Sequence, residues 1–111
     1  MTTLDSKDGY LVMINTFVVD PSRADELIAA LSHATEFGMR QRPGFISANL
    51  HISHDKRHVA NYAQWRSKDD LDAMMKDPAA QVHMREAAGI ATSFTPIYYD
   101  LLETHSAKGA P

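Results

Sequence analysis

Apolar and polar residues alternate along four short stretches of the chain, with the period of two that is typical of β-strands. The stretches Tyr10–Val19 and Pro96–Glu103 are apolar on both faces, whereas Phe45–Ser53 and His58–Trp65 carry polar residues on at least one face. The polar residues His54–Arg57 separate the two middle stretches and predict a hairpin turn. The pattern therefore predicts four strands, two of which need an apolar cover on each side.

Between these strands, apolar residues recur at steps of three and four, the period of an amphipathic helix. A first helix begins at Asp20-Pro21-Ser22, where an aspartate caps and a proline fits the first turn, and Pro43-Gly44 ends it together with its trailing turn. A second helix begins at Ser67. Asp77-Pro78 begins a further helical stretch that extends to Gly89, its C-terminal stop.

The predicted order is β-α-β-β-α(α)-β, the ferredoxin-like α+β pattern of a four-stranded antiparallel sheet with its helices on one face. We expect residues 9–103 to form a single domain, with a loose tail at 1–8 and a second tail at 104–111. Two helical segments can cover only one face of the sheet, yet its first and last strands are apolar on both. A second copy of the chain is the simplest cover, so we expect a homodimer.

Composition excludes several classes of partner and chemistry. The formal net charge is −3 and basic residues do not cluster, so we expect no nucleic-acid partner. The chain has no cysteine, and no apolar run approaches the roughly 18 residues of a membrane span. No glycine-rich phosphate loop, flavin site or nicotinamide site is recognisable. We therefore expect a cytoplasmic protein without a membrane partner.

Candidate chemistry is concentrated on one face of the strand His58–Trp65. A three-residue turn in the hairpin would place His51 opposite Asn61, on the face that also carries Trp65, whereas a two-residue turn would break this pairing. Asn15 likewise interrupts an apolar strand face. Polar residues among apolar neighbours need partners, which are either nearby backbone groups or a ligand. We favour a pocket for a flat aromatic ligand.

Two further groups of residues bear on this pocket. His83 shares an apolar helical stripe and faces inward, whereas Arg85 lies about 200° further around the helix, so both cannot point into one cavity. His51, His54 and His58 could suggest a metal site, but strand positions three apart face opposite ways. We therefore expect no metal.

The motif Asn61-Tyr62-Ala63-Gln64-Trp65, preceded about fifteen residues earlier by Pro43–Ala48, resembles the antibiotic biosynthesis monooxygenase family. It is most similar to the quinone-forming oxygenases that tailor aromatic polyketides, and the resemblance extends from about Tyr10 to Glu103. It implies a dimeric α+β barrel with a cavity between sheet and helices. It also implies oxidation of a polycyclic anthrone or hydroquinone to a quinone, without a cofactor and with O₂ as co-substrate.

The resemblance assigns catalytic roles to particular residues. Asn15, Asn61 and Trp65 match the family pattern, with the carboxamides donating to phenolic oxygens and Trp65 contributing its N–H and its ring. His51 is our candidate for the proton relay, because imidazole exchanges protons near neutral pH. The remaining candidates for substrate binding are Phe17, Leu71, Met74, His83 and Arg85, of which Arg85 would bind an acidic substituent.

Two alternatives remain open. Haem-degrading relatives of the same fold use a histidine near His83 and an asparagine that Asn15 would supply, but they also need a tryptophan where this chain has Met74. Some quinone-formers carry a tyrosine where this chain has Leu71, which leaves that role unfilled. The second alternative is a non-catalytic dimeric module that binds a small aromatic ligand.

Overall fold

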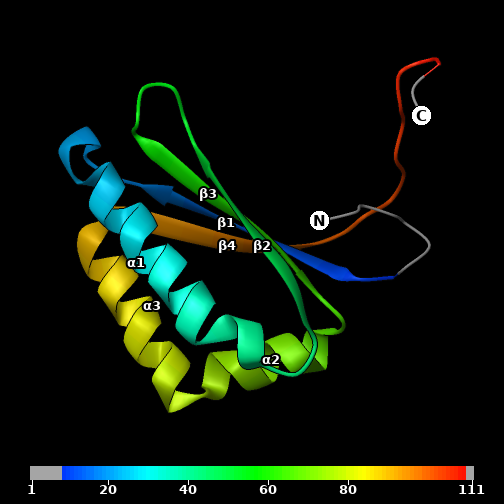
Figure 1. Ribbon diagram of the computed structural model, residues 1–111, viewed down its shortest axis with the longest axis horizontal. Coiled ribbons are helices and arrows are strands. Elements are labelled where there is room, and N and C mark those ends of the chain that lie inside the picture. Colours follow the sequence, from blue (N-terminus) through cyan, green and yellow to red (C-terminus); the bar gives the residue numbers. More distant parts are fainter. Residues whose placement is uncertain (1–8, 110–111) are drawn as a thin grey trace.

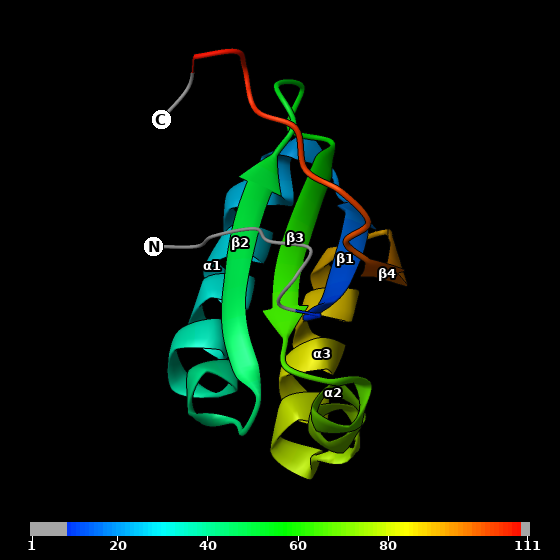
Figure 2. The same cartoon turned by 90° about the vertical axis from the view of Figure 1, so that its right-hand side faces the viewer.

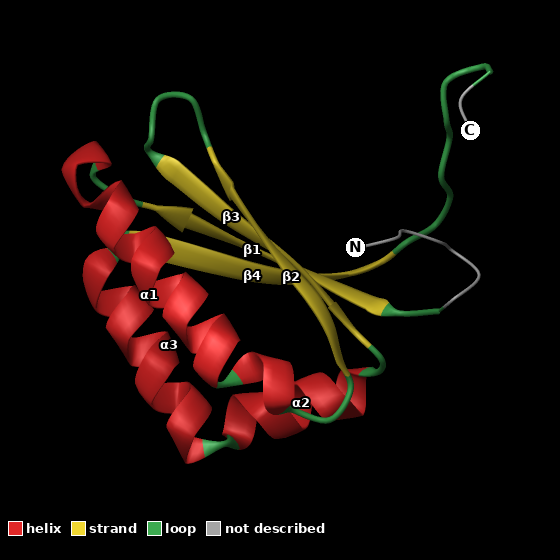
Figure 3. Cartoon of the chain, in the orientation of Figure 1, coloured by secondary structure: helices red, strands yellow, loops and turns green. Residues whose placement is uncertain are grey.

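Four antiparallel strands form one sheet, and the helices pack against one of its faces (Figures 1 and 3). The computed structural model describes residues 9–109. The strands are β1 Leu11–Val18, β2 Phe45–Ile52, β3 His58–Trp65 and β4 Ser93–Asp100. The helices are α1 Ala24–Phe37, α2 Lys68–Lys76 and α3 Pro78–Ile90, with short 3₁₀ turns η2 Pro21–Arg23 and η3 Met39–Gln41.

The order along the chain confirms the predicted ferredoxin-like α+β fold. Within the sheet the strands lie in the order β2-β3-β1-β4, so β1 and β3 are central and each has a strand on both sides. The central strands are therefore the most completely hydrogen-bonded part of the sheet, and they carry both asparagines that the sequence singled out.

The helix starts form where local capping chemistry predicts them. The carboxylate of Asp20 accepts a hydrogen bond from the backbone N–H of Ser22 at 2.9 Å. The hydroxyl of Ser67 accepts one from the N–H of Asp70 at 3.2 Å. Asp77 accepts one from the N–H of Ala79 at 2.8 Å. Each side chain satisfies a donor that the first turn of a helix leaves free.

The predicted bounds of the last two elements, a helix and a strand, are wrong. Gly89 does not stop the last helix, because α3 continues through it to Ile90. The last strand runs from Ser93 to Asp100, so it begins and ends earlier than the predicted Pro96–Glu103. Pro96 lies inside this strand, which is tolerated because β4 is an edge strand with one side free of ladder hydrogen bonds.

The predicted hairpin register is also wrong, by one residue. The three-residue turn would pair His51 with Asn61, but Leu50 lies opposite Asn61 and His51 lies opposite Ala60. The loop holds four residues, His54–Arg57, because the N–H of Ser53 still donates to the carbonyl of His58 at 2.9 Å. A slip of one residue exchanges the two faces of a strand. His51 therefore lies on the opposite face of the sheet from Asn61.

The core on the helix side consists of two clusters. One contains Phe17 and Val59 from the sheet, packed mainly against α1 and the end of α3. The other contains Met13 and Ala63, packed with residues of α2 and the start of α3. Asn15 lies between Met13 and Phe17 on β1 and is the cross-strand partner of Asn61 on β3. The pair of asparagines thus separates the two clusters.

The other face of the sheet carries no helix within residues 9–109 (Figure 2). Val18, Ile97 and Tyr99 are exposed there, and every residue of β4 is exposed.

The predicted tail at residues 1–8 lies outside the described residues, as do 110–111, so the division into a domain at 9–103 and two tails stays a prediction. None of the described helices has the length and apolar character needed to cross a membrane. The cytoplasmic location also stays a prediction.

Candidate active site

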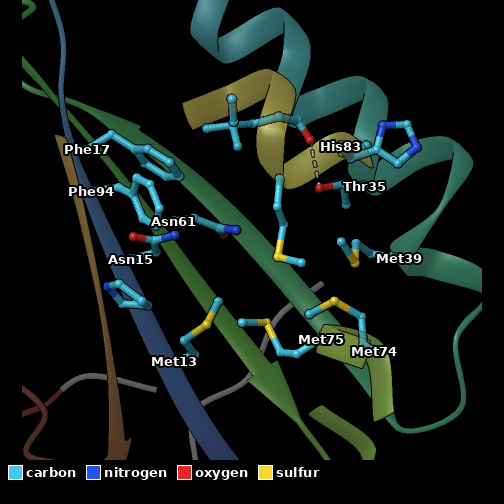
Figure 4. Close-up of a pocket in the computed structure, with 15 residues that line it drawn as sticks. Met13, Asn15, Phe17, Thr35, Met39, Asn61, Met74, Met75, His83 and Phe94 are labelled. Atoms are coloured by element: carbon cyan, nitrogen blue, oxygen red, sulfur yellow. Dashed lines mark hydrogen bonds between the residues drawn. The ribbon is translucent and has the colours of Figure 1, made fainter. Parts of the chain in front are cut away.

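A cavity of about 110 Å³ lies between the sheet and the helices (Figure 4). Its sheet wall includes Phe17, Phe94 and Pro96 together with the two asparagines, and its helix wall comes from α1, η3, α2 and α3. This volume holds several water molecules, because one water needs about 10–15 Å³ on the same measure. The walls are largely apolar, so the few polar atoms in them determine what the cavity can bind.

Asn15 and Asn61 form the polar part of the sheet wall. Their backbones are directly paired across β1 and β3, and both side chains line the cavity. In each, Oδ1 is buried and has no hydrogen-bond partner within residues 9–109. Figure 4 shows both amide nitrogens directed into the cavity. Leaving a buried polar atom unpaired costs about 1–3 kcal/mol, so two such groups at one point favour a ligand site over simple packing.

His83 is the one titratable residue among those that line this cavity in the described chain. It extends from α3 towards α1, where its ring lies 5.8 Å from the ring of His33. Its Nδ1 is buried and has no hydrogen-bond partner. A β-carbon placed on Gly38 would lie 3.8 Å from Nε2, so that edge of the imidazole packs against the end of α1. The predicted inward direction of His83 is confirmed.

Methionine dominates the helix wall. The chain has six methionines, and five of them line the cavity: Met13, Met39, Met74, Met75 and Met84. Thr35 adds a hydroxyl, which donates to the carbonyl of Leu31 at 2.9 Å and so has its hydrogen used within α1. Unbranched thioether side chains repack easily around differently shaped ligands. The cavity can therefore widen to hold a ligand larger than its empty volume.

Of the nine candidates from the sequence, five line the cavity: Asn15, Phe17, Asn61, Met74 and His83. Trp65 and Leu71 do not line it but are fully buried in the adjacent core cluster, at 1% and 0% exposure. The ring of Trp65 packs edge-on against Phe45, with ring centroids 5.5 Å apart. A catalytic role for Trp65 stays a prediction, whereas its packing role follows from these contacts.

The remaining two candidates lie away from the cavity. His51 is exposed on the other face of the sheet, where its Nδ1 lies 3.1 Å from the carbonyl of Asn49. The predicted placement of His51 beside Asn61 is therefore wrong, since it rested on the three-residue turn. Arg85 is exposed on α3, as expected for a residue about 200° from His83.

Several wall residues were missed by sequence reasoning. Met39 lies in the 3₁₀ turn η3, which has no helical or strand period from which its direction could be predicted. Phe94 belongs to the part of β4 that precedes the predicted start of the strand, and Pro96 is the first residue of the predicted strand, for which no side was assigned. Methionine was the residue type that could have pointed to this wall, since nearly all methionines of the chain line the cavity.

Within residues 9–109, no three side chains of the His, Cys, Asp or Glu types gather where they could hold a metal ion. Haem ligation by His83 fits the geometry poorly, because its Nε2 edge packs against Gly38 and would have to move to meet an iron atom. The unpaired asparagines and the apolar walls instead suit an uncharged or phenolic aromatic ligand.

Comparison with known proteins supports this description. The chain is 38% identical over 106 residues to tetracenomycin-F1 monooxygenase from Streptomyces glaucescens. The aligned region covers 96% of this chain and 92% of that protein. Its fold is similar to that of a monooxygenase from the gene ActVA-Orf6 of Streptomyces coelicolor, with a TM-score of 0.78, 24% identity, and 91% and 95% of the two chains covered. SnoaB, a cofactor-independent oxygenase from Streptomyces nogalater, has a TM-score of 0.72 at 17% identity, with 86% and 96% covered.

The family described as antibiotic biosynthesis monooxygenase matches residues 10–86. This match covers β1, β2, β3, α1, α2 and most of α3, so it includes both strands that carry the asparagine pair. The resemblance seen in the motif Asn61–Trp65 is confirmed, and the oxidoreductase class that it implied is supported by the monooxygenase relative. The chain therefore belongs to the antibiotic biosynthesis monooxygenase family.

Proposed function

We propose that the protein is a cofactor-independent monooxygenase that oxidises a polycyclic anthrone or hydroquinone to a quinone with O₂. The observation that carries this proposal is the cross-strand pair Asn15–Asn61 at an apolar cavity, whose carboxamide oxygens are buried and have no partner among the described residues. The 38% identical relative is a tetracenomycin-F1 monooxygenase, which supports a polycyclic aromatic substrate. The name of SnoaB, a cofactor-independent oxygenase, supports chemistry without a bound cofactor.

The chemistry can proceed from the substrate's own electrons. Loss of the acidic benzylic proton of an anthrone gives a carbanion that is delocalised onto a phenolic oxygen. The carbanion transfers an electron to O₂, and recombination forms a C–O bond and, after protonation, a hydroperoxide. Loss of water from this hydroperoxide leaves one oxygen atom in the quinone carbonyl and the other in water. The enzyme must stabilise the first anion and exclude bulk solvent.

Asn15 and Asn61 stabilise that anion by donating hydrogen bonds to the phenolate oxygen. Both carboxamides are attached to paired positions of the central strands, so the backbone from which they extend is fixed before the substrate binds. Donors on a fixed backbone lose less energy to reorganisation when negative charge develops. The apolar walls around them strengthen each interaction by keeping water away.

His83 accepts the benzylic proton, directly or through one water molecule. Among the described residues that line the cavity it is the one whose side chain can act as a base, and its Nδ1 has no hydrogen-bond partner in this part of the chain. This role replaces the one that the sequence suggested for His51, which lies on the other face of the sheet. A general base has to lie within reach of the proton it removes, and His51 does not.

The decisive experiment is oxygen-dependent turnover by metal-free protein. Purified protein is mixed with 1,8-dihydroxyanthrone in aerated buffer, and quinone formation is followed by absorbance, with an anaerobic reaction alongside. We expect conversion well above the spontaneous rate, and a loss of about 100-fold or more in kcat for Asn61→Ala, as for removal of one oxyanion donor.

Asn49→Ala is the matched control. Asn49 is on β2, and its side-chain amide donates to the carbonyl of Tyr62 rather than into the cavity. The same substitution there should leave turnover intact. Equal losses in both variants, or no acceleration with several anthrones and hydroquinones, would overturn the proposed function. Ligand binding without turnover would leave the non-catalytic binding module as the better account.

We also propose that the open face of the sheet is covered by a second copy of the chain. Ile97 and Tyr99 lie side by side with apolar positions of β1 on this face, and they are 46% and 44% exposed. The described segment after β4 also leaves the sheet on this side (Figure 1). Sedimentation should give a dimer that Ile97→Lys dissociates. Val82→Lys, on an exposed part of α3, should leave it intact.

A further inference from the structure

A second cavity of about 340 Å³ adjoins the first, on the side away from the asparagine pair. It lies between the segment that follows α1 and the first turn of α3. Met39 and His83 line both cavities, so these two side chains lie between the two spaces. A rotation of the flexible Met39 side chain would join the two cavities, and a polycyclic ligand that fills the first would then extend one substituent into the second.

Arg42 is the one cation of fixed charge among the residues that line this second cavity in the described chain. Its side chain is three-quarters buried, and its Nη1 forms an ion pair with the carboxylate of Asp77. Its Nε is buried and has no hydrogen-bond partner in the part of the chain that the structure describes. Burial of a charged donor without an acceptor is costly, and the cost would be relieved by an acceptor supplied from the cavity.

The geometry of a guanidinium allows it to serve two anions at once. Its five N–H donors lie in one plane and form two edges, each of which can donate a parallel pair of hydrogen bonds to a carboxylate. Asp77 occupies the Nη1 side of Arg42, whereas Nε has no partner among the described residues. Because Nε is buried, a small rotation of the guanidinium is needed to turn this edge towards the cavity. A second carboxylate on that edge would complete the hydrogen bonding of Arg42.

Asp77 is held in place and kept anionic by hydrogen bonds that do not involve Arg42. It caps α3, and the hydrogen bond from the N–H of Ala79 is the main cause that lowers the pKa of its carboxyl. It therefore fixes Arg42 at the mouth of the cavity, while its negative charge offsets part of the attraction that Arg42 exerts on another anion. Removing that charge without removing the cap should strengthen anion binding.

We infer that Arg42 binds an anionic oxygen substituent, a carboxylate, on the aromatic substrate, so that the substrate is an aromatic acid rather than a neutral ring system. This inference rests on the proposed function and adds a specificity-determining residue to it. It also reassigns the role that the sequence suggested for Arg85, whose side chain is exposed on α3 away from both cavities.

The test uses matched ligands with the full-length protein. The substrates are two 1,8-dihydroxyanthrones that differ only in a 3-carboxyl or a 3-methyl group, and the corresponding anthraquinones serve as non-reacting ligands in equilibrium dialysis. The quantity compared is the ratio of the affinities for the acid and the methyl ligand. Arg42→Gln should lower this ratio about tenfold or more, the usual effect of losing a hydrogen bond between charged groups.

Two further variants separate binding from structure. Arg40→Gln removes an exposed arginine of the same turn that pairs with Glu36, and it should leave the ratio unchanged. Asp77→Asn keeps a good capping residue but removes the competing charge, so it should keep or raise the ratio. If Arg42 and Asp77 only hold η3 against α3, Arg42→Gln and Asp77→Asn should weaken both ligands alike, and the inference is wrong.

Dialysis keeps this inference distinguishable from the proposed function. If neither anthrone is turned over but the acid quinone binds and loses its preference in Arg42→Gln, the oxygenase proposal fails and the anion site stands. If both anthrones are turned over and the ratio is the same in wild type and Arg42→Gln, the oxygenase proposal stands and the anion site is refuted. If neither quinone binds the wild type, the anion site is refuted as well.

Discussion

The two walls of the cavity differ in how rigidly they hold the side chains that line them. The sheet wall presents Asn15 and Asn61 from the two central strands, where backbone hydrogen bonds on both sides hold each position. The helix wall presents methionines from α2, α3 and the turn η3, which have several rotatable bonds each. The contrast suggests a division of labour in which the sheet fixes the reacting oxygen and the helices adapt to the rest of the ring system.

The largest effect is expected at His83, the one titratable group that the helix wall contributes. Because a glutamine side chain cannot accept the substrate's proton, His83→Gln should lower kcat by about 100-fold or more. Steady-state turnover of the anthrone measures this loss. His51→Gln is the matched control from the other face of the sheet. If the two variants behaved alike, His83 would not be the base.

A second large effect is expected at Trp65, which belongs to the sheet but not to the cavity wall. Its ring is buried in the cluster with Leu71 and Met74, so Trp65→Ala should lower the free energy of unfolding by about 3–5 kcal/mol in urea denaturation. Trp65→Phe keeps most of that packing and should keep most of the activity. Loss of activity in a stably folded Trp65→Phe protein would instead make the indole N–H part of the chemistry.

A smaller effect is expected at Met74, which tests whether the helix wall adapts. Met74→Leu conserves volume and should change the free energy of unfolding by less than about 1.5 kcal/mol. The branched leucine repacks less readily, so kcat/KM for a four-ring substrate should fall relative to that for a three-ring one. A uniform change for all ring sizes would show that methionine flexibility does not matter here.

The smallest effect is expected at Asp77, which anchors the start of α3. Asp77→Ala should lower Tm by a few degrees at pH 7, because a cap is lost. The hydrogen bond from Ala79 lowers the pKa of Asp77 below its usual 3.8, so the stability it supplies is present above that value and disappears as the pH falls through the lowered pKa. The Tm difference between variant and wild type should therefore shrink in acid.

Much of the fold could be predicted because it is encoded locally. The capping residues Asp20, Ser67 and Asp77 each mark a helix start through a hydrogen bond within a few residues. The hairpin register could not be predicted in the same way. It depends on a loop of four residues in which Lys56 adopts a left-handed conformation with φ of 62°. Lysine has no preference for this conformation, so its presence in the sequence does not predict the loop.

The residues of the candidate site also differ in how well the sequence predicts them. Asn15 and Asn61 could be found because each interrupts an apolar face of a regular strand. Met39 and Arg42 could not, because they lie in or beside an irregular turn whose direction is set by contacts with α3. The sequence therefore predicted the polar residues of the sheet wall, whereas most of the helix wall and the position of Arg42 could be found only from the structure.

The position of the asparagine pair also has a consequence for hydrogen exchange. Backbone amides of central strands open mainly when the whole domain unfolds, whereas those of edge strands such as β4 open in local fluctuations. The two residues that we propose to bind the substrate oxygen are therefore expected in the slowest-exchanging part of the molecule. Heating should preserve their geometry until global unfolding, so that catalytic activity and the cooperative loss of structure end together.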